Sequence, residues 1–211
     1  MQIGWATLRG VDVTDEVELG DRVLAITHPP DATELIDEEA FGRDEFLPYW
    51  AELWPSSIAL ARTVAALPMA GLAVVELGCG LALPSIAAAL GGAQVLATDW
   101  SPEALAYAER NARANGAELH TARVAWAEAD ALVAGAPFDL VLAADVLYEG
   151  RNAAQLRELL PWLGGEVLLA DPGRPALQGF LAAVEAEWLL APAVAEELPR
   201  GGVYRLTRRV G

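Results

Sequence analysis

The order of apolar and polar side chains divides the chain into a short leading segment and a longer repetitive one. In residues 11–27, VDVTDEVELGDRVLAIT, apolar and polar positions alternate around Gly20-Asp21. Such alternation about a glycine turn predicts a β-hairpin. Residues 31–40 follow with a helical pattern, for which Asp31 can serve as the N-cap.

A repeated exchange of strand and helix patterns begins at Leu72, after a helix that is expected to start near Pro55. The short apolar segments are LAVVEL, AQVLATD, LHTARVAW, FDLVLAADV and GEVLLAD. The helical segments between them include PSIAAALG, SPEALAYAERNARANG and RNAAQLRELLPWL. This alternation predicts an α/β fold with a mostly parallel, doubly wound sheet.

The boundaries of several elements carry signals of their own. Ser101-Pro102 suits the start of a helix and Asn115-Gly116 suits its end. A last helix is expected over about residues 175–190. The tail, which ends VYRLTRRV, is expected to return as an antiparallel edge strand.

The 211 residues are expected to form one domain, because no linker or internal repeat interrupts the pattern. We divide this domain into an N-terminal hairpin and helix extension, 1–45, and a core, 46–211. The longest uncharged stretch, Leu77 to Thr98, has the length of a membrane span, but glycines and Pro84 break it into loop, helix, turn and strand. The start, MQIGWATLRG, has no signal-peptide pattern, so we expect a cytoplasmic protein without a membrane partner.

The net charge and the cysteine content argue against certain binding partners and sites. The formal net charge is −16, which repels a phosphate backbone and argues against nucleic acid as a partner. All 14 basic residues are arginine. Cys79 is the single cysteine, and His28 and His120 lie far apart in the sequence, so neither a disulfide nor a metal site is expected.

Three acidic residues fall at the ends of predicted strands: Glu76, Asp99 and Asp145. In an open parallel sheet, ligands bind beyond the carboxyl ends of the strands, so these acids favour a ligand with positive charge and hydroxyl groups. A dinucleotide fingerprint would need glycine where this chain has Leu83, and the chain has no Walker lysine. Asp99 lies about 20 residues beyond the glycine loop, where an acid can accept both hydroxyls of a ribose.

The segments ELGCGLALPSIAAAL, LATDW, VAW and FDLVLAADVLYE, in this order, resemble the motifs of class I S-adenosylmethionine-dependent methyltransferases. More specifically, the chain resembles the seven-strand protein lysine N-methyltransferases. PYWAELWPSSIALA and DPGR resemble the branch that contains electron-transfer flavoprotein β-subunit lysine methyltransferases and bacterial proteins described as nicotinamide N-methylases. The resemblance covers about residues 46–175 and implies a Rossmann-like, seven-stranded fold that binds S-adenosylmethionine.

The resemblance also implies a set of cofactor contacts. It places the methionine part of the cofactor against Glu76, Gly78, Cys79 and Gly80, the ribose on Asp99, and the adenine between Trp100 and Trp126. Ala144 would approach the sulfonium, and Trp54 would cover the cofactor. Two positions depart from the family's pattern: Ala82 stands where many relatives have a third loop glycine, and Ala125 where many have an acid.

The acceptor site is expected at DVLY, Asp145 to Tyr148, which resembles the family's Asp-x-x-Tyr motif. A carboxylate and a phenol there can orient an incoming amine, and methyl transfer from a sulfonium requires mainly alignment and exclusion of water. We assign Asp145 to orientation and capture rather than to strong base catalysis, and Tyr148 to holding the neutral amine.

The sequence therefore predicts an S-adenosylmethionine-dependent N-methyltransferase that acts on a protein lysine. Three alternatives remain open: methylation of a small amine or nicotinamide-like acceptor, a cofactor-binding module without catalysis, and a dehydrogenase. In related nucleic-acid amine methylases, prolines stand where this chain has Val146 and Leu147, which again argues against a nucleic-acid substrate.

Overall fold

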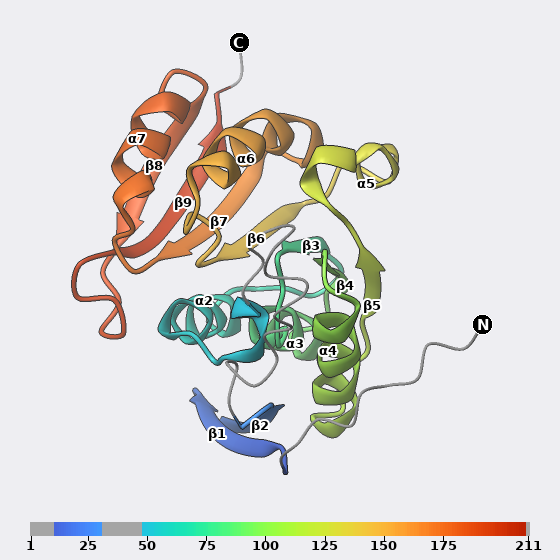
Figure 1. Cartoon of the computed structure of the whole chain (residues 1–211). Helices are drawn as coiled ribbons and strands as arrows, with labels where there is room; N and C mark the ends of the chain where they lie inside the picture. The colour runs from blue at the N-terminus through green and yellow to red at the C-terminus, as the bar shows by residue number, and fades with distance from the viewer. Residues whose placement is uncertain (1–10, 31–47, 210–211) are drawn as a thin grey trace, which may run out of the picture.

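The computed structural model describes residues 11–30 and 48–209. Its main feature is a seven-stranded sheet with the order β5-β4-β3-β6-β7-β9-β8. Every neighbouring pair is parallel except those of β9, which runs antiparallel to both β7 and β8 (Figure 1). The strands are β3 (Ala73–Leu77), β4 (Gln94–Asp99), β5 (His120–Arg123), β6 (Leu140–Ala144), β7 (Glu166–Asp171), β8 (Trp188–Ala193) and β9 (Gly202–Arg208). The predicted Rossmann-like, mostly parallel fold is confirmed.

Helices cover both faces of this sheet. One face carries α2 (Pro55–Ala65), α3 (Leu83–Leu90) and α4 (Pro102–Ala114), and the other carries α5 (Asp130–Ala134), α6 (Gly150–Leu163) and α7 (Pro175–Val184). Alternate strand residues supply the two cores: Val74 packs with the first group of helices and Val75 with the second. The central strands are apolar on both faces because both faces are covered.

The predicted edge strand is partly wrong. The tail does return antiparallel as β9, but it lies between β7 and β8 and is not an edge. The edge is β8, in a region where the end of a helix was expected over 175–190. The helix α7 ends at Val184, and residues 185–187 form a turn. Trp188, the first residue of β8, is 1% exposed and packs with Phe180 and Leu206 in the core. Burial of this large aromatic ring favours the strand over continuation of the helix.

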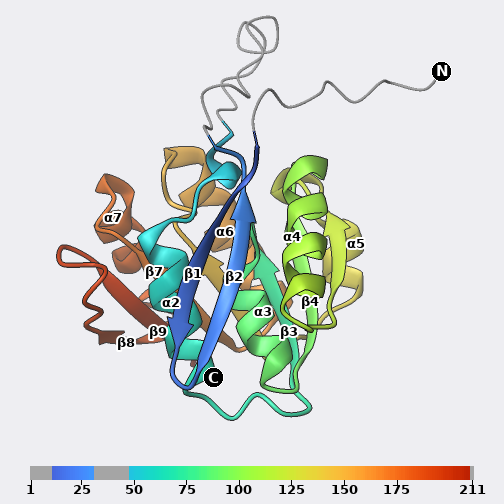
Figure 2. The same cartoon turned by 90° about the horizontal axis from the view of Figure 1, so that it is seen from below.

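The predicted hairpin is confirmed as β1 (Val13–Leu19) and β2 (Arg22–His28), joined at Gly20-Asp21. It forms its own two-stranded sheet, which lies over the helical layer with β1 towards α2 and β2 towards α4 (Figure 2). Two asparagines fix it there: the side-chain amides of Asn111, in α4, and of Asn115, at its C-cap, exchange hydrogen bonds with the backbones of Thr27 and Ala25, respectively. The predicted helix over 31–40, with its cap Asp31, lies outside the described residues.

The helix boundaries agree with the sequence signals that predicted them. Ser101 caps α4 by accepting a hydrogen bond from the amide of Ala104, and Gly116 follows the helix with φ of +68°. Pro55 stands in the first turn of α2. In the described part of the chain, no helix is both long and apolar enough to cross a bilayer.

Candidate active site

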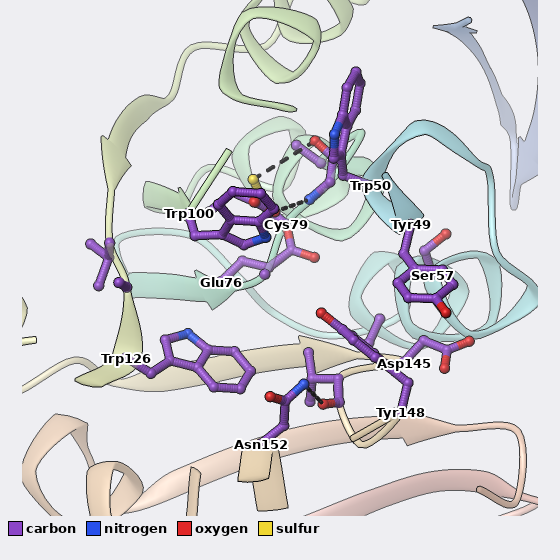
Figure 3. Close-up of a pocket in the computed structure, with 18 of the residues that line it drawn as sticks. Tyr49, Trp50, Ser57, Glu76, Cys79, Trp100, Trp126, Asp145, Tyr148 and Asn152 are labelled. Carbon is purple, nitrogen blue, oxygen red and sulfur yellow. Dashed lines mark hydrogen bonds between the residues drawn. The ribbon is translucent and has the colours of Figure 1, made fainter. Parts of the chain in front are cut away.

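A cavity of about 860 Å³ opens at the carboxyl ends of the central strands. Loops after β3, β4, β5 and β6 form its walls, together with the segment that leads into α2. Figure 3 shows Trp100, Trp126 and Glu76 towards one end, and Asp145, Tyr148 and Tyr49 towards the other. The eleven residues singled out from the sequence all line this cavity: Trp54, Glu76, Gly78, Cys79, Gly80, Asp99, Trp100, Trp126, Ala144, Asp145 and Tyr148.

The turn after β3 needs its glycines for two separate reasons. Gly78 and Gly80 have φ of +65° and +50°, a left-handed conformation that disfavours side chains. In addition, a Cβ on Gly80 would lie 3.2 Å from the backbone oxygen of Trp50, so the segment before α2 rests directly on the turn. Ala82 also has a positive φ, +62°, a conformation that glycine adopts more readily than alanine.

Glu76 is the buried acid at the end of β3. It is 1% exposed, and its Oε2 accepts hydrogen bonds from the backbone amide (2.9 Å) and the hydroxyl of Ser85. Burial raises the pKa of Glu76, and the charge of Asp99 adds to this effect, whereas the two hydrogen bonds from Ser85 lower the pKa. The net result is a pKa of about 8. The carboxyl is therefore mostly protonated near neutral pH, in the absence of a cation.

Asp99, at the end of β4, is the second buried acid of the cavity. One of its oxygens accepts a hydrogen bond from the amide of Gly80 and the other from the amide of Ser101, both at 3.0 Å. Burial raises the pKa of Asp99, although these amides oppose the shift. No ion pair to Glu76 or Asp99 is found among residues 11–30 and 48–209. Two buried carboxyls without a basic partner make this end of the cavity favourable to a cation.

Cys79 lies between these acids, but its surroundings make it unreactive. The thiol is buried, and burial together with the nearby Asp99 and Glu76 raises its pKa well above the ordinary value. A protonated thiol is a poor nucleophile, so Cys79 serves as a small residue of the turn. In the described ranges, no cluster of His, Cys, Asp and Glu could hold a metal ion.

Two tryptophans line the end of the cavity beyond these acids. Trp100 follows β4 and is 37% exposed, and its carbonyl accepts a hydrogen bond from Arg123 Nε at 2.8 Å. Trp126 begins the 3₁₀ turn η3 (Trp126–Glu128), with its ring close to Gly78. The missing acid at Ala125 is not replaced by a neighbour in sequence, but Glu128, one turn on, also lines the cavity.

Asp145 is held in an unusual way at the opposite end. It has φ of +56° and is 7% exposed. Its Oδ1 accepts a hydrogen bond from Arg174 Nε at 2.8 Å, and its Oδ2 a longer one, 3.4 Å, from the hydroxyl of Ser56. A left-handed conformation at a residue other than glycine is a strained feature that is common at functional sites.

Aromatic rings surround this carboxylate. The ring of Tyr148, 37% exposed, lies 5.0 Å from that of Tyr49, and burial raises the pKa of its phenol. Tyr49 belongs to the 3₁₀ turn η2 (Tyr49–Ala51), and its carbonyl accepts a hydrogen bond from Trp54 Nε1 at 2.7 Å. Trp54 also lies under the guanidinium of Arg174. The part of the segment that touches the glycine turn is Trp50, so the covering role assigned to Trp54 stays a prediction.

Sequence reasoning missed four contributors to this site: Tyr49, Trp50, Ser56 and Arg174. Arg174 is the last residue of the DPGR segment, which served only as a point of resemblance, and its sequence position gives no sign of the ion pair with Asp145. The other three lie within or beside PYWAELWPSS. A pattern of apolar positions could not assign them to the cavity, because the segment has no regular period there.

The sequence of this chain is similar to those of known proteins. A model of the family described as lysine methyltransferase matches residues 50–167. The electron transfer flavoprotein beta subunit lysine methyltransferase of Danio rerio is 37% identical over 137 residues, which cover 60% of this chain and 51% of that protein. The chain thus spans about half the length of the curated relatives it matches first.

Two solved structures share the fold. A 16S ribosomal RNA methyltransferase of T. thermophilus, in complex with AdoMet and guanosine, superposes with a TM-score of 0.69 at 16% identity, covering 97% of this chain and 52% of that one. Magnesium protoporphyrin IX methyltransferase from Synechocystis, with bound SAM, gives 0.58 at 21% identity, covering 74% and 80%. At these identities the likeness concerns the fold. The family match extends over more than half of the sequence and includes the glycine turn, both buried acids and the DVLY segment, so this chain belongs to the lysine methyltransferase family.

Proposed function

We propose that the chain is an S-adenosylmethionine-dependent N-methyltransferase whose acceptor is a protein lysine. The observation that carries the proposal is the pair of buried acids, Glu76 and Asp99, beside a glycine turn and without a basic partner in the described residues. A phosphate ligand would be disfavoured there, because no basic side chain of the described residues would balance its charge beside these buried carboxyls. A ligand with a sulfonium, an ammonium and ribose hydroxyls would supply the missing positive charge and hydrogen-bond donors.

The residues of the cavity fit each part of this cofactor. Asp99 keeps lone pairs for ribose hydroxyls while its oxygens hold the amides of Gly80 and Ser101. Glu76, Gly78, Cys79 and Gly80 would line the methionine part, and Ala144 would border the sulfonium. Trp100 and Trp126 present aromatic surface for the adenine, with Glu128 within the same wall. When bound, the cofactor supplies an electrophilic methyl group.

The protein's own contribution to the reaction is alignment. Asp145 and Tyr148 would hold the acceptor amine by hydrogen bonds at the opposite end of the cavity, with its lone pair directed at the methyl carbon. A cofactor bound beside Ala144 would supply the methyl carbon to this nitrogen, and its sulfur would keep the bonding pair as a neutral thioether. The methylated ammonium then gives its extra proton to water. Because the leaving group is neutral, no acid is needed.

The names of the relatives favour a protein acceptor. One group of them is named for the electron transfer flavoprotein beta subunit and another for ribosomal protein L11, of which the Vibrio cholerae protein is 36% identical over 118 residues, covering 54% of this chain and 36% of that protein. The net charge of −16 also suits a basic protein surface better than nucleic acid.

The proposal is tested by incubating the purified protein and a cell lysate with methyl-labelled S-adenosylmethionine. We expect label on lysine side chains of one or a few proteins. Since this chain contains no lysine, methylation of the enzyme itself cannot produce labelled lysine. Label confined to small molecules would replace the protein acceptor with a small amine. Tight cofactor binding with no label transferred to any acceptor would indicate a binding module, and affinity for NADH alone would indicate a dehydrogenase.

A further inference from the structure

Arg174, in the turn after β7, contacts Asp145, which lines the proposed acceptor end of the cavity. Its Nε donates a hydrogen bond to Asp145 Oδ1 at 2.8 Å, and its guanidinium carbon lies 5.7 Å from the ring centroid of Trp54. The Arg174 side chain is 31% exposed, whereas that of Asp145 is 6% exposed. The carboxylate therefore has a cationic partner before any acceptor arrives.

The backbone under Arg174 is fixed by the chain around it. Asp171 Oδ1 accepts hydrogen bonds from the amides of Gly173 (2.8 Å) and Arg174 (2.7 Å). Gly173 has φ of +94°, and a Cβ there would lie 2.5 Å from the backbone oxygen of Arg200. Such close packing restricts the turn, so Arg174 is directed at Asp145 by the fold rather than by a chance surface contact.

The charges around the pair keep the guanidinium positive. Asp145 reaches it from the loop after β6, Asp171 from the end of β7, and the phenol of Tyr49 from η2. Partial burial alone would lower the pKa of Arg174, but the hydrogen bond and charge of Asp145 and the charge of Asp171 raise it above its ordinary value. Tyr204 faces Asp171 from β9, and burial and that charge raise the pKa of its phenol. Glu149 and Arg151, beside the loop after β6, form an ion pair with each other, and Glu52 also lines the cavity.

This pairing bears on the protonation of the acceptor. A lysine amine has an ordinary pKa of about 10.4 and attacks only after losing its proton. An uncompensated carboxylate within about 4–6 Å would favour the ammonium form and so oppose the reaction. A carboxylate already paired with a guanidinium offers the same hydrogen-bond acceptor without that excess negative charge.

We propose that Arg174 is a positioning residue that compensates the charge of Asp145, so that the carboxylate accepts a hydrogen bond from a neutral amine instead of holding an ammonium. Trp54 supports this role by packing under the guanidinium. The inference rests on the proposed amine methylation, and it replaces electrostatic capture at Asp145 with orientation of the uncharged nucleophile.

The first test needs no methyl acceptor. Binding of n-butylammonium, a mimic of the charged lysine end, is titrated at pH 7.5 by NMR of the pocket residues. Arg174→Gln should bind the probe at least about tenfold more tightly than wild type, because Asp145 loses its partner. Arg174→Lys keeps the charge and should stay within about threefold of wild type. Arg205→Gln breaks an ion pair with Glu166 outside the cavity and is the matched control for loss of one positive charge.

Equal binding of the probe by wild type and Arg174→Gln would overturn the inference. If Arg174→Gln does not fold, Arg174→Met answers the same question, since it keeps an unbranched apolar side chain beside Trp54 and removes the guanidinium. That variant should also bind the probe at least about tenfold more tightly than wild type, and unchanged binding would equally overturn the inference.

The second test uses the acceptor protein isolated by its label. With saturating acceptor, the rising limb of kcat against pH should move up by about one pH unit or more in Arg174→Gln but not in Arg174→Lys. A merely structural role would lower kcat without moving the limb. Failure of wild type to label any acceptor would refute the proposed function, whereas the butylammonium titration would still decide the role of Arg174.

Discussion

Asp99 Oδ2 accepts a hydrogen bond from the backbone amide of Gly80 at 3.0 Å, so the acid at the end of β4 also holds the glycine turn that follows β3. One carboxylate thus joins the two loops that face the proposed ribose and methionine parts of the cofactor. Its second oxygen holds the amide of Ser101, at the start of α4.

Replacing Asp99 with Ala should weaken binding of S-adenosylmethionine by about 1.5–3 kcal/mol, because charge-assisted hydrogen bonds to the ribose are lost. Calorimetry measures this change. Ser101→Ala is the matched control, since it removes the cap of the same helix, worth about 1 kcal/mol of stability, without touching the ribose. Unchanged cofactor affinity in a folded Asp99→Ala protein would refute the ribose assignment.

Glu76 should make the stability of the cofactor-free protein depend on pH. Its pKa is about 8 in the folded protein and lies near 4.5 in the unfolded chain. Between these values the unfolded chain releases the proton and the folded protein keeps it. The stabilisation is therefore complete below about pH 4.5 and is lost as the pH rises towards 8, by an amount on the order of a few kcal/mol.

Denaturant unfolding at several pH values checks this prediction. Glu76→Gln keeps the shape and removes the titration, so its stability relative to wild type should rise from pH 5 to pH 8. A constant difference between the two proteins would contradict the shifted pKa. A bound cation should lower the pKa of Glu76 again, so calorimetry in buffers of different ionisation enthalpy should detect proton release on cofactor binding, and Glu76→Gln should abolish it.

Asp145→Asn should separate catalysis from cofactor binding. The amide keeps the size of the side chain but replaces one acceptor oxygen with a donating NH2 group and removes the charge that pairs with Arg174, so we expect turnover to fall by roughly 10²-fold or more. Cofactor affinity should stay close to that of wild type, because Asp145 lies at the other end of the cavity. Turnover on the labelled acceptor and calorimetry on the same preparation measure the two effects.

A control variant and two contrary outcomes test the assignment of Asp145. Ser56→Ala removes only the longer, 3.4 Å hydrogen bond to Asp145 and should have a smaller effect on turnover. Equal losses of binding and turnover in Asp145→Asn would make Asp145 a folding or cofactor residue, and near-normal turnover would remove it from the mechanism.

Gly80→Ala should be more harmful than Gly116→Ala, although both glycines have a positive φ. At Gly116 a Cβ meets nothing within 4 Å, so only the left-handed conformation is penalised, by about 1–2 kcal/mol. At Gly80 the Cβ would also press on the backbone oxygen of Trp50 at 3.2 Å. Thermal unfolding should show a larger loss of stability for Gly80→Ala than for Gly116→Ala. Cofactor calorimetry should show weaker binding for Gly80→Ala and unchanged binding for Gly116→Ala. Equal effects at both positions would show that the contact with Trp50 is unimportant.

Those parts of the fold that depend on local periodicity were predictable from the sequence. Apolar strands that alternate with amphipathic helices specify a parallel sheet, because only burial on both faces explains strands that are apolar throughout. The ends of those strands then place Glu76, Asp99 and Asp145 at one edge, since parallel strands end on the same side. Capping and turn residues such as Ser101 and Gly20 gave element boundaries for the same local reason.

The contacts between residues far apart in the sequence depend on how the elements pack. The strand β9 lies between β7 and β8 because pairing partners and the burial of Trp188 are settled by packing, which no single segment encodes. Arg174 is 29 residues from Asp145, and Trp50 is 30 residues from Gly80, yet both pairs are in contact. Whether an acid is free to hold a cation depends on its burial and partners. Glu76 and Asp145 look alike in the sequence, since both follow apolar strand residues, but in the fold Asp145 is paired with Arg174 whereas Glu76 accepts hydrogen bonds from Ser85.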